Sequence, residues 1–119
     1  SPFVYGFIGE SSSLPVRVAN GELWLADRTI GLEAKDMPDG DAILYFRPQE
    51  IELLDGCGGC IAGTVAASRR VAGSRRVELK IGGQREQVEI ELPVGHPAAQ
   101  QSRVAFRPRR YKVFPAKAT

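Results

Sequence analysis

Two copies of the tripeptide Phe-Arg-Pro constrain this sequence more than any other feature. They occupy Phe46–Pro48 and Phe106–Pro108, 60 residues apart. In each copy an apolar alternating run precedes the tripeptide, and a short tail that is first polar and then apolar follows it. Internal repetition is the signature of duplicated structural units, so the pattern predicts a fold of two related halves. Proline brings no N–H donor to a sheet, so each copy is expected to end a strand.

Alternating apolar residues between turn signals predict about ten short strands and no interior helix. Asn20-Gly21 is a strong hairpin signal because both residues tolerate positive φ. Residues 77–81 and 88–92 alternate apolar with polar side chains, which is typical of an antiparallel pair with one buried face. The sequence therefore predicts an all-β fold of two small barrels of the oligonucleotide/oligosaccharide-binding (OB) type.

The predicted halves are residues 11–56 and residues 57–119, preceded by a linking segment at residues 1–10. Halves of about 60 residues are marginal alone, so we expect them to share one core. The linking segment is expected to form a short helix, with Ser1 as N-cap and Pro2 in the first helical position. The sequence lacks an initiator Met, and we expect Ser1 to follow a cut within a longer protein.

Basic residues are clustered rather than numerous. The formal charge is only +2, which is too small to indicate nucleic-acid binding by itself. Guanidinium groups match oxyanions in shape and charge, so clustered arginines are candidates for anion binding, although a solvated basic face explains them as well. The candidate anion-binding residues are Ser68, Arg69, Arg70, Arg75 and Arg76 in a predicted hairpin, and Arg47 and Arg107 beside the repeated prolines.

The two cysteines form the motif C-G-G-C at Cys57 and Cys60. A zinc site needs four ligands, and the sequence offers no second cysteine pair and only one histidine, His96. The flanking glycines predict a loop rather than the helix start of a redox motif. We therefore expect neither zinc binding nor thiol catalysis, and a disulfide within the loop is the remaining alternative.

Motifs for bond-making chemistry are missing from these 119 residues. There is no phosphate-binding G-x-x-x-x-G-K-[ST] or G-x-G-x-x-G sequence, and no combination of serine, histidine and aspartate that favours catalysis. No apolar run approaches the roughly 20 residues that span a bilayer. The prediction is a chain without catalytic residues, metal site or cofactor of its own.

Residues Pro2–Glu10, PFVYGFIGE, resemble the segment that follows the ATPase domain in import-type ABC transporter ATP-binding subunits. Gly9-Glu10, Leu14 and the sequence LYFRP at residues 44–48 are most similar to the sulfate/thiosulfate importers. The resemblance extends from Pro2 to about Pro115, and the C-G-G-C loop departs from it. It implies a C-terminal regulatory domain of the TOBE/MOP type, made of two intertwined OB-like half-barrels.

The same resemblance implies the partners of the chain. The longer protein would bind ATP and Mg and hydrolyse ATP at the cytoplasmic face of the inner membrane to drive oxyanion import. This domain would join two ATP-binding subunits as a homodimer, next to the ATPase domain of its own chain and, through it, the membrane subunits. An oxyanion effector is a further expected partner, and nucleic acid is not.

Two other functions fit the sequence less well. The first is an independent module that binds molybdate or sulfate. The second is an OB-type nucleic-acid-binding domain, in which Tyr45, Phe46, Phe106 and Tyr111 would supply stacking rings. The two phenylalanines lie in the most apolar runs and are expected in the core, which disfavours the second alternative.

Overall fold

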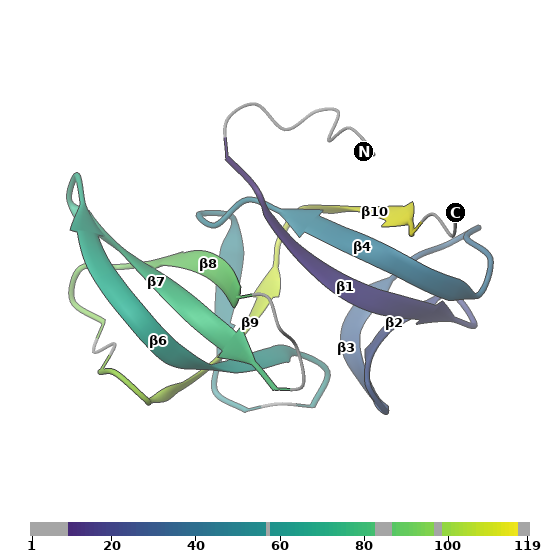
Figure 1. The fold of residues 1–119 in the computed structure, drawn as a ribbon, viewed down its shortest axis with the longest axis horizontal. Helices are drawn as coiled ribbons and strands as arrows, with labels where there is room; N and C mark the ends of the chain where they lie inside the picture. The colour runs from purple at the N-terminus through teal and green to yellow at the C-terminus, as the bar shows by residue number, and fades with distance from the viewer. Residues whose placement is uncertain (1–9, 57, 83–86, 97–98, 117–119) are drawn as a thin grey trace.

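The structure is a computed structural model that describes residues 10–56, 58–82, 87–96 and 99–116. All secondary-structure elements in these ranges are strands, so the all-β prediction is confirmed there (Figure 1). The helix predicted within residues 1–10 falls on residues 1–9, which lie outside the described residues, and Glu10 has no regular structure. The strands form two antiparallel five-stranded sheets.

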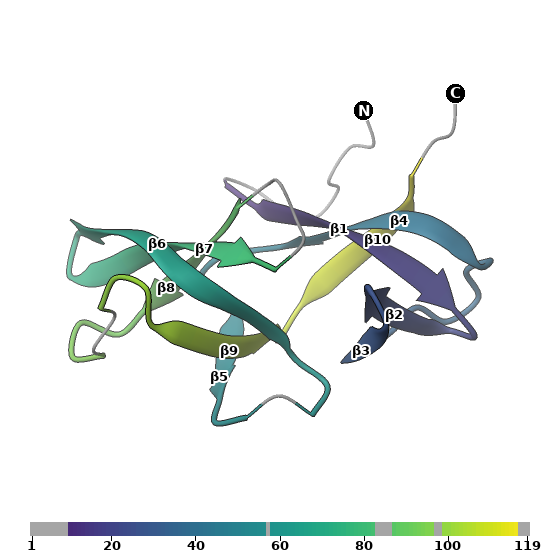
Figure 2. The same ribbon diagram turned by 60° about the horizontal axis from the view of Figure 1, so that its bottom comes forward.

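The first sheet has the order β10-β4-β1-β2-β3. Asn20 and Gly21 both have positive φ, 53° and 76°, and they form the tight turn between β1 and β2 that the sequence predicts. The sheet curls, so that β2 and β3 turn away from β1 and β4 (Figure 2). Its strands are β1 (Ser12–Ala19), β2 (Glu22–Leu25), β3 (Arg28–Glu33), β4 (Gly40–Phe46) and β10 (Tyr111–Pro115).

The second sheet has the order β5-β9-β6-β7-β8. Its longest pair is the basic hairpin β6–β7, where Ala72 and Gly73 have positive φ of 45° and 85°. This is the hairpin that the sequence predicts around Arg69–Arg76, and Ser74 pairs with Val71 as the first residue of β7. The strands are β5 (Ile51–Leu54), β6 (Ile61–Val71), β7 (Ser74–Ile81), β8 (Gln87–Leu92) and β9 (Arg103–Pro108).

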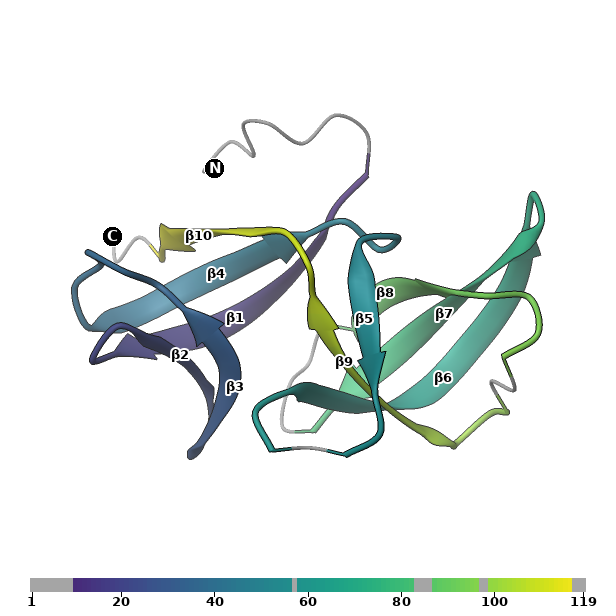
Figure 3. The same cartoon turned by 180° about the vertical axis from the view of Figure 1, so that it is seen from behind.

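The chain crosses from one sheet to the other immediately after each Phe-Arg-Pro tripeptide. After Pro48 the chain leaves β4 of the first sheet and forms β5, which pairs with β9 of the second. After Pro108 it leaves β9 and forms β10, which pairs with β4 of the first (Figure 3). Each sheet therefore contains one strand from the opposite half of the sequence, and the repeated tripeptide marks both crossing points.

The two repeated phenylalanines meet in the centre of the core. Phe46 and Phe106 are both fully buried, and their ring centroids lie 5.6 Å apart with the rings tilted by 50°. Buried side chains from both sheets form one hydrophobic cluster around this pair. The other largest fully buried side chains are Leu14, Leu23, Ile30, Leu44, Ile61, Leu79, Ile90 and Leu92.

Hydrogen bonds outside the strand ladders link the two edges of each sheet. In the first sheet the hydroxyl of Tyr111 on β10 donates to the carbonyl of Glu33 on β3 at 2.8 Å and accepts from the Glu33 amide at 3.2 Å. In the second sheet the Glu91 amide on β8 donates to the carbonyl of Pro48, just before β5, at 2.9 Å. Both sheets are thereby drawn toward closure.

Candidate functional site

The β6–β7 hairpin brings four of the candidate arginines together. In its ladder Arg69 lies opposite Arg76, and Arg70 lies opposite Arg75. Like charges directly opposite on a sheet repel each other, so a row of arginine pairs needs compensating anions. Among the described residues, nearby carboxylates supply this compensation for one pair of arginines but not for the other.

Arg76 is the most enclosed cation of the hairpin, with 11% of its side chain exposed. Its Nε donates to Oε1 of Glu91 at 3.0 Å, and its Nη1 donates to Oε2 of Glu89 at 2.9 Å. The same Nη1 also donates to Oε1 of Glu10, which precedes β1. One guanidinium thus joins β7 and β8 of the second sheet to the segment through which the chain enters the first.

Arg69 completes this group through Glu89. Its Nη1 and Nη2 donate to the two carboxylate oxygens of Glu89 at 3.2 and 3.3 Å, a bidentate pair. We call Arg69, Arg76, Glu10, Glu89 and Glu91 the arginine–glutamate cluster. Close by, the Ser12 hydroxyl donates to the Glu89 carbonyl at 2.7 Å, which fixes the start of β1 against β8.

The cluster shifts the pKa values of its two central members. Burial acts to lower the pKa of Arg76, but hydrogen bonds from its side chain to Glu10, Glu89 and Glu91 outweigh burial and raise it above its ordinary value. Burial acts to raise the pKa of Glu89, but hydrogen bonds from Arg69 and Arg76 outweigh burial and lower it. Both groups are therefore held in their charged forms.

The lowered pKa of Glu89 predicts a loss of stability in acid. In the folded chain it lies below the ordinary value of 4.5, so the unfolded chain binds more protons near that pH. The stabilisation is present above the unfolded pKa and disappears as the pH falls through the folded one. Comparing urea unfolding at about pH 7 and about pH 3, we expect Glu89→Gln to lose less stability than the unsubstituted chain.

Glu52→Gln is the matched control for this prediction, because Glu52 is an exposed carboxylate on β5 that belongs to no ion pair among the described residues. The control should keep the acid sensitivity of the unsubstituted chain. Equal acid sensitivity in Glu89→Gln and the unsubstituted chain would show that Glu89 does not carry this linkage.

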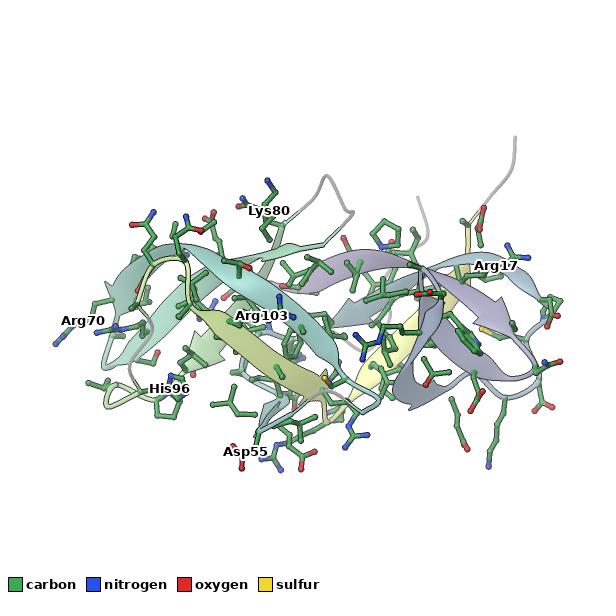
Figure 4. The ribbon with its side chains drawn as sticks, turned by 90° about the horizontal axis from the view of Figure 1, so that it is seen from below. Arg17, Asp55, Arg70, Lys80, His96 and Arg103 are labelled. Atoms are coloured by element: carbon green, nitrogen blue, oxygen red, sulfur yellow. The ribbon has the colours of Figure 1, made fainter. Side chains whose placement is uncertain are left out.

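The remaining hairpin candidates lie outside the arginine–glutamate cluster. Ser68 and Arg70 are exposed, and Arg70 lies at the outer end of the molecule (Figure 4). Arg75 is half-buried. Anion binding by the hairpin stays a prediction, but an incoming anion would have to compete with carboxylates for Arg69 and Arg76. Of the four hairpin arginines, Arg70 and Arg75 lie outside the arginine–glutamate cluster.

Arg47 and Arg107 lie at the two crossing points and not in the hairpin. Both are half-buried. Nη1 of Arg107 donates to the carbonyl of Gly59 at 3.2 Å and so holds the loop between β5 and β6. Arg47 also has an interaction partner. The geometry gives Arg107 a structural role at the crossing, and anion binding by either residue stays a prediction.

The C-G-G-C loop contains a disulfide-bonded cysteine. Cys60 is buried, with 4% of its surface exposed, and is disulfide-bonded. Cys57, the only other cysteine of the sequence, lies outside the described residues. A disulfide is the alternative that the sequence analysis left open for this loop.

Within the described ranges no group of three or more histidine, cysteine, aspartate or glutamate side chains is arranged to hold a metal ion. No helix long and apolar enough to cross a membrane occurs in the same ranges.

The sequence analysis missed a basic cavity between the two sheets. The cavity has a volume of about 330 Å³ and is lined by the β2–β3 turn on one side and by strands β6, β7 and β9 on the other. Its charged lining residues are Asp27, Arg28, Lys80 and Arg103. These residues come from three separate segments of the sequence and form no motif. Only the way in which the strands pair brings them together, and the sequence does not indicate that pairing.

The comparisons with known proteins point to one family and one kind of relative. The TOBE-like domain family matches residues 55–109. Over 98% of its length the chain is 79% identical to the sulfate/thiosulfate import ATP-binding protein CysA of Mesorhizobium japonicum. It is 73% identical, again over 98%, to the protein of that name from Brucella melitensis, and 60% identical over 96% to CysA 2 of Rhizobium meliloti.

These matches concern the C-terminal part of the relatives. The chain covers 34% of the Mesorhizobium protein, 32% of the Brucella protein and 31% of the Rhizobium protein. The chain therefore spans about a third of the length of the curated relatives that it matches.

Proposed function

Because residues 55–109 carry a TOBE-like domain and nearly the whole chain matches the C-terminal part of sulfate/thiosulfate import ATP-binding proteins, we propose that it is the regulatory and dimerisation domain of such a subunit. The observation that carries the proposal is the 79% identity over 98% of the chain. In the longer protein an ATPase domain would bind ATP and Mg. That protein would lie at the cytoplasmic face of the inner membrane, against the membrane subunits.

In this proposal the two sheets are OB-like half-barrels that are intertwined by strand exchange. The division is residues 11–56 and 57–119, with residues 1–10 as the helical link to the ATPase domain. Support comes from β5 and β10, each of which pairs in the sheet formed mainly by the other half. An exchange of this kind ties the two halves together, which suits a domain that joins two ATP-binding subunits.

The arginine–glutamate cluster suits the regulatory role. Glu10 is the last residue of the proposed ATPase link, and Arg76 connects it to strands β7 and β8 of the second sheet. Charge-assisted hydrogen bonds of this kind fix orientation as well as adding stability. The orientation of the linking segment would therefore depend on the conformation of the second sheet.

A rate measurement tests the regulatory part of this proposal. In the assembled transporter, ATP hydrolysis by the longer protein should decrease as sulfate is raised on the cytoplasmic side. A version of the protein that ends before Glu10 should hydrolyse ATP without this decrease. The same sulfate response in both versions would contradict regulation by this domain.

A further inference from the structure

Strand β6 extends well beyond the strand that pairs with it on one side. It has 11 residues, Ile61–Val71, but β9 pairs with it only over residues 61–64. Hydrogen bonds from the segment before β9 continue this contact as far as Ala66, whose carbonyl accepts from Nε2 of Gln100 at 3.1 Å. Over residues 67–71 no described segment pairs with β6 on this side, and each of these residues is exposed.

The free edge of β6 offers backbone hydrogen-bonding groups at alternate residues. Both residues of the hairpin turn have positive φ, and a turn of this type is closed by a hydrogen bond between the flanking residues, Val71 and Ser74. In an antiparallel pair, residues that exchange hydrogen bonds alternate with residues that do not. The register has no shift between this turn and Ala67, so the N–H and C=O groups of Ser68 and Arg70 point away from β7.

This edge is long enough to accept a short extended segment of another chain. At about 3.4 Å per residue, residues 67–71 provide an edge about 17 Å long. An extended segment laid along it would exchange backbone hydrogen bonds with Ser68 and Arg70, the recognition mode called β-strand addition. Pairing of this kind requires a partner with a polypeptide backbone.

The charges along the edge favour an acidic segment. Arg70 on β6 lies directly opposite Arg75 on β7, on the same face of the hairpin. Among the described residues neither takes part in an ion pair, whereas Arg69 and Arg76, the next pair along the hairpin, are paired with glutamates. A strand added beside β6 would place a side chain next to Arg70 on that face. A carboxylate there would relieve the repulsion between the two arginines.

The same charges disfavour a second copy of this chain as the occupant of the edge. If two β6 edges paired with each other in antiparallel direction, residues 67–71 of one copy would lie against the same residues of the other. The arginines of both copies would then lie close together and repel each other. Cationic side chains on a strand edge are a recurrent means of preventing such self-pairing.

Two exposed valines add apolar contact area at the same end of the molecule. In the described part of the chain the exposed large hydrophobic side chains are Val71, at 37%, and Val94, at 43%. Val71 is the last residue of β6, and Val94 follows the end of β8 by two residues. Figure 4 shows Arg70 at the same end as His96, which comes two residues after Val94. A partner with an aliphatic side chain beside its carboxylates would bury apolar surface here.

We propose that residues 67–71 of β6, together with Arg75 and Val94, form a docking surface for an extended acidic segment of another protein. The segment would continue, beside residues 67–71, the position that β9 occupies beside residues 61–64. Backbone pairing would fix its register, and carboxylates next to Arg70 would select it over neutral segments. The proposal does not rest on the regulatory and dimerisation role proposed above.

Fluorescence anisotropy with a labelled synthetic peptide in which glutamate alternates with threonine tests the surface at low ionic strength. The unsubstituted chain should bind the peptide, and Arg70→Glu should bind it at least about tenfold more weakly, since hydrogen bonds to charged groups contribute at least this factor. Arg17→Glu is the matched control, because it makes the same charge change at an exposed arginine of the first sheet. Its affinity should equal that of the unsubstituted chain.

Two changes that keep every charge test the backbone pairing. Ser68→Pro removes an N–H donor from the free edge without removing one from the β6–β7 ladder. A peptide that is methylated on alternate backbone nitrogens loses the matching donors of the partner. Each change should weaken binding at least about fivefold. Circular dichroism should show that Ser68→Pro is folded, and the methylated peptide gives the same test on the unsubstituted chain.

Four results would overturn the proposal. The first is no binding of the peptide by the unsubstituted chain up to millimolar concentration. The second is equal affinity for the methylated peptide, which would show attraction by charge alone. The third is equal binding of a single-stranded oligonucleotide of the same charge, which would assign the surface to nucleic acid. The fourth is a lower mass of Ser68→Pro in light scattering, which would assign the edge to contact between two copies.

Failure of the docking surface is distinguishable from failure of the proposed function. With no binding of the peptide, the unsubstituted chain could still have the mass of a dimer. A monomeric chain could still bind the peptide along β6.

Discussion

Replacing Phe106 with alanine is expected to lower the free energy of unfolding by about 3–5 kcal/mol, the range for large buried aromatic residues. Phe106 is fully buried and packs against Phe46 at 5.6 Å between ring centroids. It also lies opposite Leu53 on one neighbouring strand and Ile61 on the other. The cavity left by its ring would open at the point where the chain crosses between sheets, and urea unfolding measures the loss.

Phe114→Ala is the matched control for this prediction. Phe114 lies on β10, is half-buried, and makes an edge-to-face contact with Tyr45 at 5.7 Å on the outer face of the first sheet. Its removal should cost about 1–2 kcal/mol, because less apolar surface is returned to water and no closed cavity forms. Equal losses in the two variants would show that the Phe46–Phe106 pair is not the centre of the core.

Replacing Gly31 with alanine is expected to cost about 2–5 kcal/mol, the sum of a conformational and a steric penalty. Gly31 on β3 has a φ of +77°, which a residue with a Cβ adopts at a cost. A Cβ at this position would also overlap the carbonyl oxygen of Gly59 and lie 2.6 Å from Nη1 of Arg107. The loop between β5 and β6 would have to move, and urea unfolding again measures the loss.

Gly21→Ala separates the two penalties. Gly21 has almost the same φ, +76°, but nothing lies within 4 Å of the Cβ position. This variant should lose only the conformational part, about 1–2 kcal/mol. If Gly31→Ala is no less stable than Gly21→Ala, then the contact between β3 and the β5–β6 loop is not as close as the structure shows.

Local patterns in the sequence predicted the strands well. Asparagine and glycine tolerate positive φ, which Asn20 and Gly21 both adopt, so the hairpin could be predicted from these two residues alone. Alternation identified the buried faces of β7 and β8, because one face of each strand packs on the core. The burial of Phe46 and Phe106 followed from the apolar runs around them, and the structure confirms it.

Long-range pairing could not be read from the sequence. The residues of β5 do not indicate that this strand pairs with β9 and not with β4, because strand pairing depends on the packing of the whole core. The repeat marked both crossing points without revealing that the chain crosses there. Similarly, Glu10 lies 66 residues before Arg76 in the sequence, and only the fold brings it into the arginine–glutamate cluster.

The mass of the purified chain in solution tests the central claim, that this is a dimerisation domain, most directly. Light scattering over a range of concentrations should give twice the 12.9 kDa of one chain, with and without sulfate. Dilution should reveal a single monomer–dimer equilibrium. A mass of one chain at the highest concentration that remains soluble would contradict the claim.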